Sequence, residues 1–463
     1  MVRLFRVFFP ANVLLLLISE LLLVFGSYLL GGWLVLDEEL IPYLYVENGW
    51  FRIGLVVLSV LLGMHLTDLY RNIRVTSRSA LAQDLCQVMG IALLAQGLIS
   101  YAFPPIRLGR GIMLVGSALA LTALVCWRLF YSAVVLDVVG WRRILFVGNN
   151  QLVQEMAEHI LEQPDRGFAI AGYLSDDDPE GAALAGGAVL GRVADVRKVA
   201  ERVNPSLIVV GLTERRARMP VHDLLELRFA GYTIQEAGTT YEAVLGRICT
   251  KELRPSQLIF SDELGPQRVF VAIQNLLNYS ACLTGAVLAL PLMALVGILV
   301  KLTSRGPILY RQTRVGRNGK LFTLYKFRSM YVNAEALTGA VWAAKDDPRV
   351  TWLGHWLRRT RLDELPQFYN VLRGDMSLVG PRPERPEFVE TLAERIPYYR
   401  QRHCVRPGLT GWAQINHKYG DSIEDVITKL EYDLYYIKHM SPALDAYILF
   451  QTFKTILLTR GAR

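Results

Sequence analysis

The chain has 463 residues, which is long for one ordinary hydrophobic core, so two or three structural units are expected. Its 50 lysines and arginines against 42 aspartates and glutamates give a formal net charge of +8, which favours anionic partners such as membrane surfaces, nucleotides or phosphates. The five cysteines are scattered, with no CxxC pair and no histidine spaced to complete a zinc site. This pattern argues against a disulfide framework or a structural metal and favours a reduced compartment with inert thiols.

Four apolar segments occupy the first third of the chain, at about residues 11–35, 52–69, 85–106 and 111–136. Each is close to the roughly 20 residues that a helix needs to cross a bilayer. The first segment is not followed by the small-residue site that a cleavable signal peptide requires, so we expect it to be retained. Residues 1–140 are therefore predicted to form a membrane-spanning α-helical bundle of four spans.

The charges around these segments predict their orientation, because lysine and arginine accumulate on the cytoplasmic side of a membrane. The loop at 37–50 carries four carboxylates and, before Arg52, no basic residue, as an external loop should. Arg107 and Arg110 in the second external turn do not fit this pattern. The basic residues on the predicted inner side are Arg3, Arg6, Arg71, Arg74, Arg78, Arg142 and Arg143. We expect both ends of the bundle to face the cytoplasm.

Residues 141–265 alternate short apolar runs, such as RRILFVGNN and SLIVVGL, with amphipathic stretches. Strand alternating with helix predicts a parallel α/β sheet of the Rossmann type. The first turn, from Gly148 to Gln151, keeps only the first glycine of the G-x-G-x-x-G fingerprint, so backbone cannot approach a pyrophosphate closely. A structural or regulatory domain without a redox cofactor is therefore favoured over a dinucleotide-binding one.

A fifth apolar segment, at about 276–300, is long enough to cross a membrane but contains Pro291 near its middle. Basic residues lie on both sides of it, so both of its flanks are predicted to be cytoplasmic. This favours a re-entrant helical hairpin that enters one leaflet and returns at the proline. An ordinary fifth span kinked by proline is the alternative.

The last part of the chain, 266–463, carries the polar motifs. In ILYRQTRVGRNGKLFTLYKFRSM the first cations suit an anchor to anionic lipids, whereas Lys326 and Arg328 lie in a strand-like apolar context that favours a bound anion. No P-loop is present. In RLDELPQFYNVL a helix is expected to start near Asp363, with Asp363 at or beside its N-cap and Glu364 next.

These two carboxylates lie beside several arginines, at a place where a helix N-terminus can bind phosphate. Adjacent helical residues point about 100° apart, which favours two separate roles. One carboxylate would attack a phosphate and the other would bind Mg²⁺. A capping aspartate followed by a glutamate that the helix dipole favours is the purely structural alternative.

Four blocks, RQTRVGRNGKLFTLYKFRSM, RLDELPQFYNVLRGDMSLVGPRPE, RPGLTGWAQI and EYDLYYIKHMSPALDAYILFQT, resemble in order the signatures of the bacterial sugar transferase family. The resemblance covers about residues 270–460 and implies an α/β-type catalytic domain with a re-entrant hairpin. The upstream spans and Rossmann-like domain resemble the large form of that family. Its members are phosphoglycosyl transferases of the bacterial inner membrane, with the catalytic domain on the cytoplasmic face.

The resemblance implies transfer of a sugar-1-phosphate from a UDP-sugar to undecaprenyl phosphate, with release of UMP, to initiate exopolysaccharide, capsule or O-antigen assembly. It implies Asp363 as the nucleophile that forms a phosphosugar intermediate and Glu364 as the Mg²⁺ ligand. It also places phosphates at Lys326 and Arg382. Further roles implied on the matching positions are Arg406 and Asp433 at the nucleotide and Pro291 at the hairpin break. Leu290 replaces a polar residue of the family's hairpin.

Two other functions make different demands on the sequence. A membrane-anchored nucleotide-sugar dehydratase or epimerase would need a G-x-x-G-x-x-G loop and a Tyr-x-x-x-Lys pair, and the chain has neither. A catalytically silent scaffold for polysaccharide assembly is compatible with the sequence. His403 and His417 have no partner evident in sequence and are interpreted as loop histidines. A homodimer through the Rossmann-like domain is a further hypothesis, no nucleic-acid partner is expected, and the sequence does not name the sugar.

Overall fold

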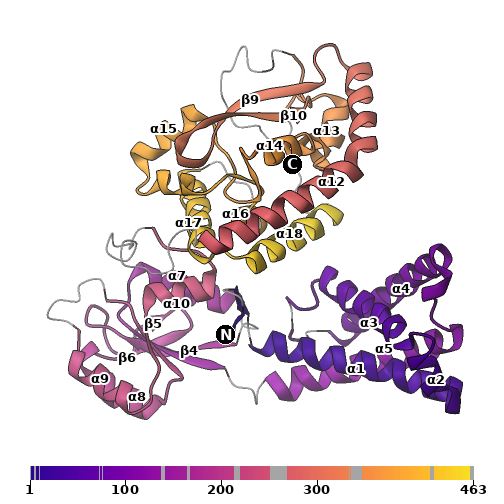
Figure 1. Ribbon diagram of the computed structural model, residues 1–463. Helices are drawn as coiled ribbons and strands as arrows, with labels where there is room; N and C mark the ends of the chain where they lie inside the picture. Colours follow the sequence, from indigo (N-terminus) through magenta and orange to yellow (C-terminus); the bar gives the residue numbers. More distant parts are fainter. Residues whose placement is uncertain are drawn as a thin grey trace. The chain divides into compact units, whose positions relative to one another are not determined.

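The computed structural model describes residues 2–4, 7–9, 11–71, 73–75, 77–136, 141–163, 167–212, 219–250, 268–332, 334, 347–417 and 422–458. Most of the chain before Gly238 belongs to one compact unit, and Gly238–Arg463 belongs to a second. Two short strands, β1 (Val2–Leu4) and β2 (Val7–Phe9), pair near the N-terminus. The first unit contains the four N-terminal apolar helices and a six-stranded sheet, and the second contains the fifth apolar segment and the polar motifs (Figure 1).

The four apolar segments near the N-terminus are helical. They form α1 (Ala11–Leu36), α3 (Gly49–Leu66), α4 (Arg78–Ala102) and α5 (Arg110–Phe130), which continues into a π-turn at Tyr131–Val135. A 3₁₀ turn (Asp37–Glu39) and α2 (Leu40–Tyr45) fill most of the predicted loop between α1 and α3. Each long helix is apolar and long enough to cross a membrane.

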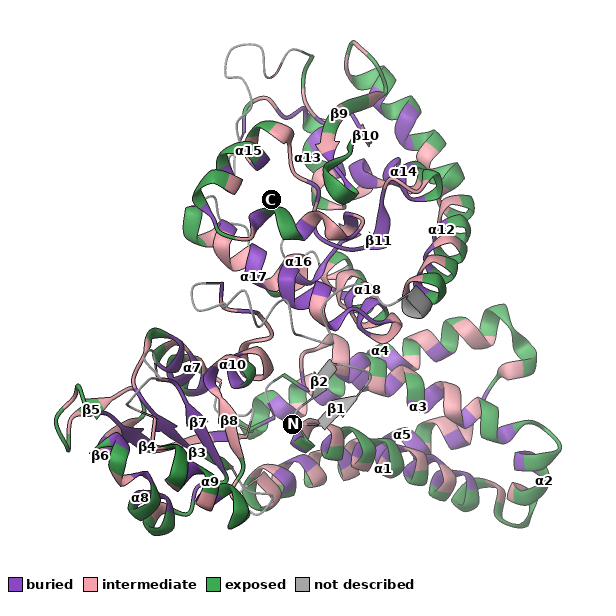
Figure 2. Ribbon diagram, turned by 60° about the vertical axis from the view of Figure 1, so that its left-hand side comes forward, coloured by how far each residue is buried: buried purple, intermediate pink, exposed green. Residues whose placement is uncertain are grey.

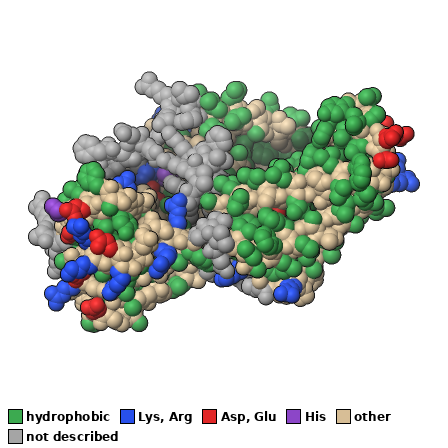
Figure 3. Space-filling model, turned by 90° about the horizontal axis from the view of Figure 1, so that it is seen from below, with side chains coloured by type: hydrophobic (Ala, Val, Ile, Leu, Met, Phe, Trp, Pro, Cys, Tyr) green, Lys and Arg blue, Asp and Glu red, His purple; other side chains and the backbone are tan. Residues whose placement is uncertain are grey.

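The bundle buries one set of apolar side chains and exposes another. Leu16, Val24, Val60, Leu85 and Leu124 are buried in its core. Leucines on the outside are largely exposed, and Figure 3 shows hydrophobic side chains gathered over the bundle and charged ones over the sheet domain. A surface of this kind is suited to lipid rather than water.

A buried ion pair joins α1 to α5 inside the bundle. Arg128 Nε donates to Glu20 Oε1 at 2.7 Å, and Arg128 Nη2 donates to Glu20 Oε2 at 3.3 Å. Arg128 Nη1 donates to the backbone oxygen of Leu69 at 2.9 Å, and the guanidinium lies 5.5 Å from the ring centre of Tyr70. Glu20 is 0% exposed and Arg128 2%. Each charge is paired and hydrogen-bonded, as a charge in an apolar bundle must be.

The predicted parallel α/β sheet is present. Its strand order is β5-β6-β4-β3-β7-β8, and every pairing except β5 with β6 is parallel. Figure 2 shows the central strands buried beneath helices whose outer faces are exposed. The strands are β3 (Arg142–Val147), β4 (Phe168–Leu174), β5 (Ala183–Leu184), β6 (Gly187–Gly191), β7 (Leu207–Val210) and β8 (Ile234–Glu236), and the helices are α7 (Gln151–Glu162), α8 (Val196–Val203) and α9 (Val221–Phe229).

The turn after β3 has a structural explanation that does not involve a ligand. Gly148 has φ of +98°, and a Cβ there would lie 2.6 Å from the oxygen of Gly211, so a larger residue would be both strained and crowded. Asn150 caps α7 through Oδ1, which accepts from the backbone N–H of Val153 at 3.0 Å. The side chain of Asn150 thus takes one of the N–H groups that would otherwise face an anion.

The second unit is built around a long helix and two small pairs of strands. The strands are β9 (Leu309–Val315) with β10 (Leu321–Phe327), which are antiparallel, and β11 (Ser377–Val379) with β12 (Gly408–Thr410), which are parallel. Around them lie α10 (Ala237–Leu245), α12 (Arg268–Thr303), α13 (Trp352–Arg359), α14 (Gln367–Arg373), α15 (Pro386–Arg395), α16 (Trp412–Asn416), α17 (Ile423–His439) and α18 (Pro442–Leu457).

The segment predicted as a two-helix hairpin is a single helix, α12, with Pro291 inside it. Figure 1 shows this helix changing direction along its length. Both of its halves contact the same unit: Asn278 Nδ2 donates to Ser377 Oγ at 2.8 Å, whereas Val296 and Val300 pack with Phe327. The remaining face exposes many leucines, among them Leu276 at 72% and Leu288 at 74%. Both halves of α12 are therefore held against one domain, while a long apolar face of the helix stays exposed.

A buried polar cluster anchors the first half of α12. Gln274 donates to the hydroxyl of Tyr436 at 3.0 Å and to Asp445, and Tyr436 donates to Asp445 Oδ1 at 2.8 Å. Burial raises the pKa of Asp445 to about 7, and the hydrogen bonds from Gln274 and Tyr436 oppose that rise. The carboxyl group is thus expected to change charge near neutral pH.

This cluster predicts a pH-dependent stability. Because the pKa of Asp445 is higher in the folded protein than its ordinary 3.8, the folded state holds more protons between about pH 4 and 7, and stability falls as the pH rises through that window. We expect a lower Tm at pH 8 than at pH 5.5 in thermal melting, with a smaller difference in Asp445→Asn. The control Glu394→Gln, on the exposed face of α15, should keep the wild-type difference. An unchanged pH dependence in Asp445→Asn would contradict this assignment.

Candidate active site

A cavity of about 1410 Å³ lies in the second unit, and the predicted polar motifs line it. Its walls come from β9, β10, the segment 381–388, α16, α17 and the turn that carries Asp363 and Glu364. Lys326 and Arg382 line the same cavity. Four of the residues that the sequence singled out for phosphate chemistry are therefore brought together.

The local structure around the two carboxylates differs from the predicted helix start. Leu362–Glu364 form a separate 3₁₀ turn, and α14 begins only at Gln367, after Pro366. Arg361 precedes the turn with φ of +59°, a left-handed conformation that breaks the chain direction after α13. The prediction that Asp363 caps the helix is wrong. The separate turn leaves Asp363 6% exposed and Glu364 8% exposed at the cavity.

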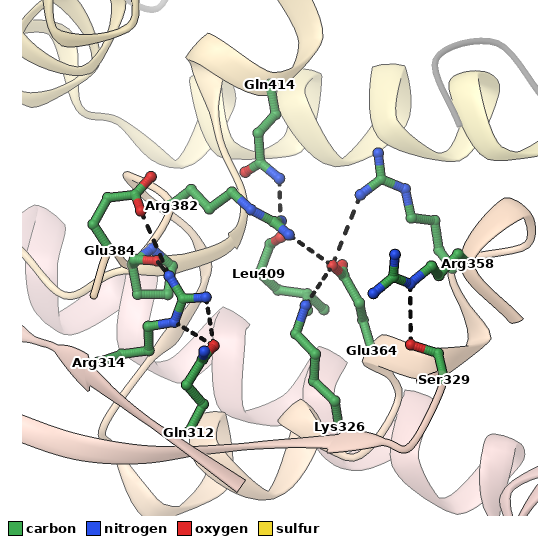
Figure 4. A network of polar contacts seen from close by, with 12 residues as sticks. Gln312, Arg314, Lys326, Ser329, Arg358, Glu364, Arg382, Glu384, Leu409 and Gln414 are labelled. Atoms are coloured by element: carbon green, nitrogen blue, oxygen red, sulfur yellow. Dashed lines mark hydrogen bonds and ion pairs between the residues drawn. The ribbon is translucent and has the colours of Figure 1, made fainter. Parts of the chain in front are cut away.

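Three cations surround one oxygen of Glu364. Lys326 Nζ lies 3.1 Å from Glu364 Oε1, Arg382 Nη2 lies 2.9 Å from it, and Arg361 Nη1 lies 3.8 Å from it. Figure 4 shows Lys326 and Arg382 approaching the carboxylate of Glu364 from different sides. Burial alone would raise the pKa of Glu364, but Lys326, Arg382 and Arg361 outweigh it and lower that pKa well below its ordinary value. Glu364 is thus held ionised.

Asp363 lies in the opposite electrostatic environment. Burial raises its pKa, Lys326 and Arg358 oppose the rise, and the neighbouring charge of Glu364 adds to it. No cation lies within ion-pair distance of Asp363 among the pairs that the described residues form. Two adjacent carboxyl groups whose pKa values move apart are suited to different roles, one as a fixed charge and one as a reacting group.

Arg328 and Arg406 were predicted to bind substrate, and in the structure each of them makes a contact with α12. Arg328 Nη2 donates to the backbone oxygen and the hydroxyl of Ser304, both at 2.7 Å, and so caps the end of α12 although it borders the cavity. Arg406 Nη1 donates to Asn275 Oδ1 at 3.0 Å on the first half of α12, and Arg406 does not line the cavity. The nucleotide role of Arg406 stays a prediction.

Asp433 does line the cavity, where it pairs with an arginine that the sequence analysis missed. Arg402 Nη2 lies 2.7 Å from Asp433 Oδ2, and Arg402 Nη1 donates to the hydroxyl of Tyr399 at 2.7 Å. Burial raises the pKa of Asp433 to about 6, against the opposing effect of Arg402. The only sequence signal for Arg402 was its place among the basic residues just before the RPGLTGWAQI block.

Other cavity residues were also missed. Gln312 and Arg314 share one face of β9, with Arg314 Nη2 donating to Gln312 Oε1 at 2.6 Å, and Glu384 lies 3.5 Å from Arg314 (Figure 4). Their spacing of two residues along a predicted strand was the sequence signal that both side chains lie on the same face. Arg358 also faces the cavity, and its Nε donates to Ser329 at 3.0 Å.

The two histidines were interpreted as loop residues with no partner evident in sequence. His417 lies just after α16, outside the helices and strands; it lines the cavity, and its Nε2 lies 3.0 Å from Asp425 Oδ1, a partner that the sequence did not reveal. For His403, burial and then the charge of Arg402 lower the pKa to about 4, which keeps the ring neutral at physiological pH. Neither histidine touches Asp363 or Glu364 among the hydrogen bonds of the described residues.

The donor set at the cavity fits Mg²⁺ bound together with a phosphate. The described residues contain no cluster of three or more His, Cys, Asp or Glu side chains that could hold a metal alone. Mg²⁺ does not need one, since it usually binds through one or two carboxylates, several waters and substrate phosphates. Glu364 is ionised, and its contacts with Lys326, Arg361 and Arg382 are all made by Oε1. An ionised carboxylate that faces the cavity is the type of ligand that Mg²⁺ prefers, so Glu364 is the candidate ligand.

An ionised carboxylate ringed by lysine and arginine, beside a second carboxyl group in a large cavity, defines a site for phosphoryl chemistry on anionic substrates. The bacterial sugar transferase family matches residues 269–459, and a CoA-binding domain family matches residues 65–225.

Relatives of known name support the first match. The chain is 32% identical over 436 residues to the UDP-glucose:undecaprenyl-phosphate glucose-1-phosphate transferase of Escherichia coli K12, covering 91% of each chain. It is 45% identical over 222 residues to the UDP-N-acetylgalactosamine-undecaprenyl-phosphate N-acetylgalactosaminephosphotransferase of Aeromonas hydrophila, covering 48% of this chain and 52% of that one. It is 39% identical to the exopolysaccharide production protein PSS of Rhizobium leguminosarum, covering 41% of this chain and 98% of that one. The chain belongs to the bacterial sugar transferase family.

Proposed function

We propose that this protein transfers a sugar-1-phosphate from a UDP-sugar to undecaprenyl phosphate, releases UMP, and thereby initiates the assembly of an exopolysaccharide, capsule or O-antigen. The observation that carries the proposal is the pair of adjacent carboxyl groups of Asp363 and Glu364. Lys326 and Arg382 keep Glu364 ionised, whereas burial raises the pKa of Asp363. Relatives named for this reaction support it.

In the proposed first step, a carboxylate oxygen of Asp363 attacks the sugar-bearing phosphorus of the UDP-sugar. The bond from that phosphorus to the bridging oxygen breaks, and UMP leaves with the oxygen and its electron pair. In the second step, a phosphate oxygen of undecaprenyl phosphate attacks the same phosphorus and the bond to Asp363 breaks, which restores the carboxylate. No separate base takes part in either step, because the attacking groups are a carboxylate and a phosphate, which react as anions.

The surrounding side chains have roles that follow from their charge. Lys326 and Arg382 lie where they can neutralise the transferred phosphoryl group, since both already converge on the neighbouring carboxylate of Glu364. The wall with Asp433, Arg402 and Lys429 would hold the nucleotide half of the donor. Glu364 would bind Mg²⁺, which when bound screens the negative charge of the diphosphate.

We further propose that the four N-terminal helices cross the cytoplasmic membrane with both ends inside, and that α12 enters one leaflet and returns to the same side. The two-ended contact of α12 with one domain supports this, because a helix that crossed the bilayer would separate its two ends. An acceptor phosphate at the depth of lipid headgroups would then be within reach of Asp363. A homodimer through the sheet domain stays a hypothesis.

The topology can be tested by thiol labelling in a variant without the five native cysteines. Single cysteines at Arg268 and Lys320 are expected to react with an impermeant reagent in inside-out vesicles and not in intact spheroplasts. A cysteine at Glu38, between the first two spans, is the control and should show the opposite pattern. Labelling of positions 268 and 320 from opposite sides would establish a complete crossing.

The function is tested by UMP release from a panel of UDP-sugars, using full-length protein in nanodiscs with and without undecaprenyl phosphate. We expect release that requires Mg²⁺ and favours one sugar, together with a lipid-linked sugar product. Absence of release with every sugar would contradict the proposed reaction and favour a scaffold role.

A further inference from the structure

The catalytic unit begins upstream of the sugar transferase match. Residues 242–250, here called the α10 segment, comprise the end of α10 and the chain that follows it, whereas the family match starts at residue 269. They belong to the same compact unit as the cavity. A relative that the alignment covers almost completely matches only 41% of this chain, so a sugar transferase domain also occurs in much shorter proteins. The α10 segment therefore adds contacts to the sugar transferase domain that lie outside the family match.

The α10 segment makes polar contacts with α17. The carboxylate of Glu242 accepts from Lys438 Nζ at 2.8 and 2.9 Å and lies 3.4 Å from His439 Nε2. At its other end, the backbone N–H of Thr250 donates to Glu431 Oε1 at 3.0 Å. Glu431 is 4% exposed and His439 3%, whereas the side chains of Lys438 and Glu242 are 22% and 15% exposed, so these contacts range from buried to partly buried.

The same segment contacts α16 through Trp412. The indole Nε1–H donates to the backbone oxygen of Gly246 at 2.7 Å, and the ring stacks on Tyr435 of α17 with centroids 5.6 Å apart. Gly246 has φ of +67°, and a Cβ there would lie 3.4 Å from the indole ring. The backbone at Gly246 therefore adopts a left-handed conformation in direct contact with Trp412.

The faces of α16 and α17 opposite to these contacts line the cavity. Val426, Lys429 and Asp433 follow one another at spacings of three and four along α17 and share its cavity face. Glu431 lies two residues from Asp433, which places it about 200° around the helix, on the back face. Trp412 and Gln414 of α16 are related in the same way, with Gln414 at the cavity. The α10 segment thus supports the wall from behind.

We infer that the α10 segment holds α16 and α17 in place for the nucleotide half of the donor, with Glu242 and Trp412 as positioning residues for the UDP-sugar. The inference rests on the proposed function. Neither side chain lines the cavity, and neither is near Asp363 or Glu364 in the contacts described. Loosening the wall should weaken binding of the nucleotide while leaving the two carboxyl groups and the lipid side of the site unchanged.

The test uses full-length protein in nanodiscs and varies UDP-sugar and undecaprenyl phosphate separately. Trp412→Phe keeps the stacked ring and removes the N–H donor, and Glu242→Gln removes the charge that pairs with Lys438. Each is expected to raise KM for UDP-sugar by about threefold to tenfold, which corresponds to the loss of one partly buried hydrogen bond or ion pair. KM for the lipid and kcat should stay within about twofold of wild type, since transition-state contacts are retained.

Matched controls separate positioning from general damage. Trp356→Phe changes a 60% exposed tryptophan on α13, and Glu394→Gln changes an exposed glutamate on α15, so both should keep all three constants. Unchanged kinetic constants in Trp412→Phe and Glu242→Gln would overturn the inference, and so would equal changes in the two KM values. In either case an active wild type would still support the proposed function. An inactive wild type would overturn both. If Trp412→Phe does not fold, Glu242→Gln, which leaves the ring stack untouched, decides the outcome.

Discussion

Asp363→Asn is expected to abolish UMP release and sugar-phosphate transfer, lowering kcat by at least about 10³-fold. An amide has nearly the shape of the carboxylate but cannot attack phosphorus. Because burial raises the pKa of Asp363, its ionised form is unfavourable in the fold, so the substitution should leave Tm equal to or above that of wild type. Loss of activity with retained stability would identify a chemical role rather than a structural one.

The measurement is steady-state UMP release, combined with mass spectrometry of the protein incubated with UDP-sugar alone. Wild type should gain the mass of a sugar phosphate on the peptide that contains Asp363, and the variant should not. Asp375→Asn, which removes the partner of Arg373 outside the cavity, is the control and should keep both signals. UMP release that survives in Asp363→Asn would mean that the lipid phosphate attacks the donor directly.

Glu364→Gln is expected to lower kcat by about 10²-fold and to raise the Mg²⁺ concentration needed for half-maximal activity by about tenfold or more. Glu364 is the only carboxylate that contacts Lys326, Arg382 and Arg361 among the ion pairs of the described residues. The neutral amide would leave three cations facing one another and would remove the candidate metal ligand.

A Mg²⁺ titration of initial rates checks this second prediction, with Glu387→Gln as the control because its side chain is 63% exposed on α15. The control should have the wild-type Mg²⁺ dependence. A Glu364→Gln protein with reduced kcat and an unchanged Mg²⁺ requirement would show that Glu364 orders the cations and does not bind the metal.

The sequence predicted the centre of the site better than its surroundings. Asp363, Glu364, Lys326 and Arg382 were singled out because their chemistry is specific, and the cavity brings all four together. Arg328 and Arg406 are indistinguishable from such residues in sequence, since a guanidinium suits a helix end as well as a phosphate. Only the fold shows that the first caps α12 and that the second binds Asn275.

The fold was predictable where a local pattern of apolar and polar residues specifies the secondary structure. Apolar runs of about 20 residues marked the N-terminal helices, and strand alternating with helix marked the parallel sheet. Contacts between distant positions carry no local signal, so Arg402 with Asp433 went unpredicted. The start of α14 was misplaced because the left-handed backbone at Arg361, a residue type that rarely adopts it, inserts a separate turn.

The ion pair between Glu20 and Arg128 has a consequence for biosynthesis. Glu20 lies inside α1, and an acidic residue near the middle of a single helix opposes its release into lipid by about 2.5–3.5 kcal/mol on insertion scales. Its partner is synthesised 108 residues later, so α1 emerges from the ribosome well before its charge can be neutralised. Until α5 arrives, α1 carries this cost without compensation, so a chain truncated before Arg128 should hold its first helix in the bilayer less stably than the full chain does.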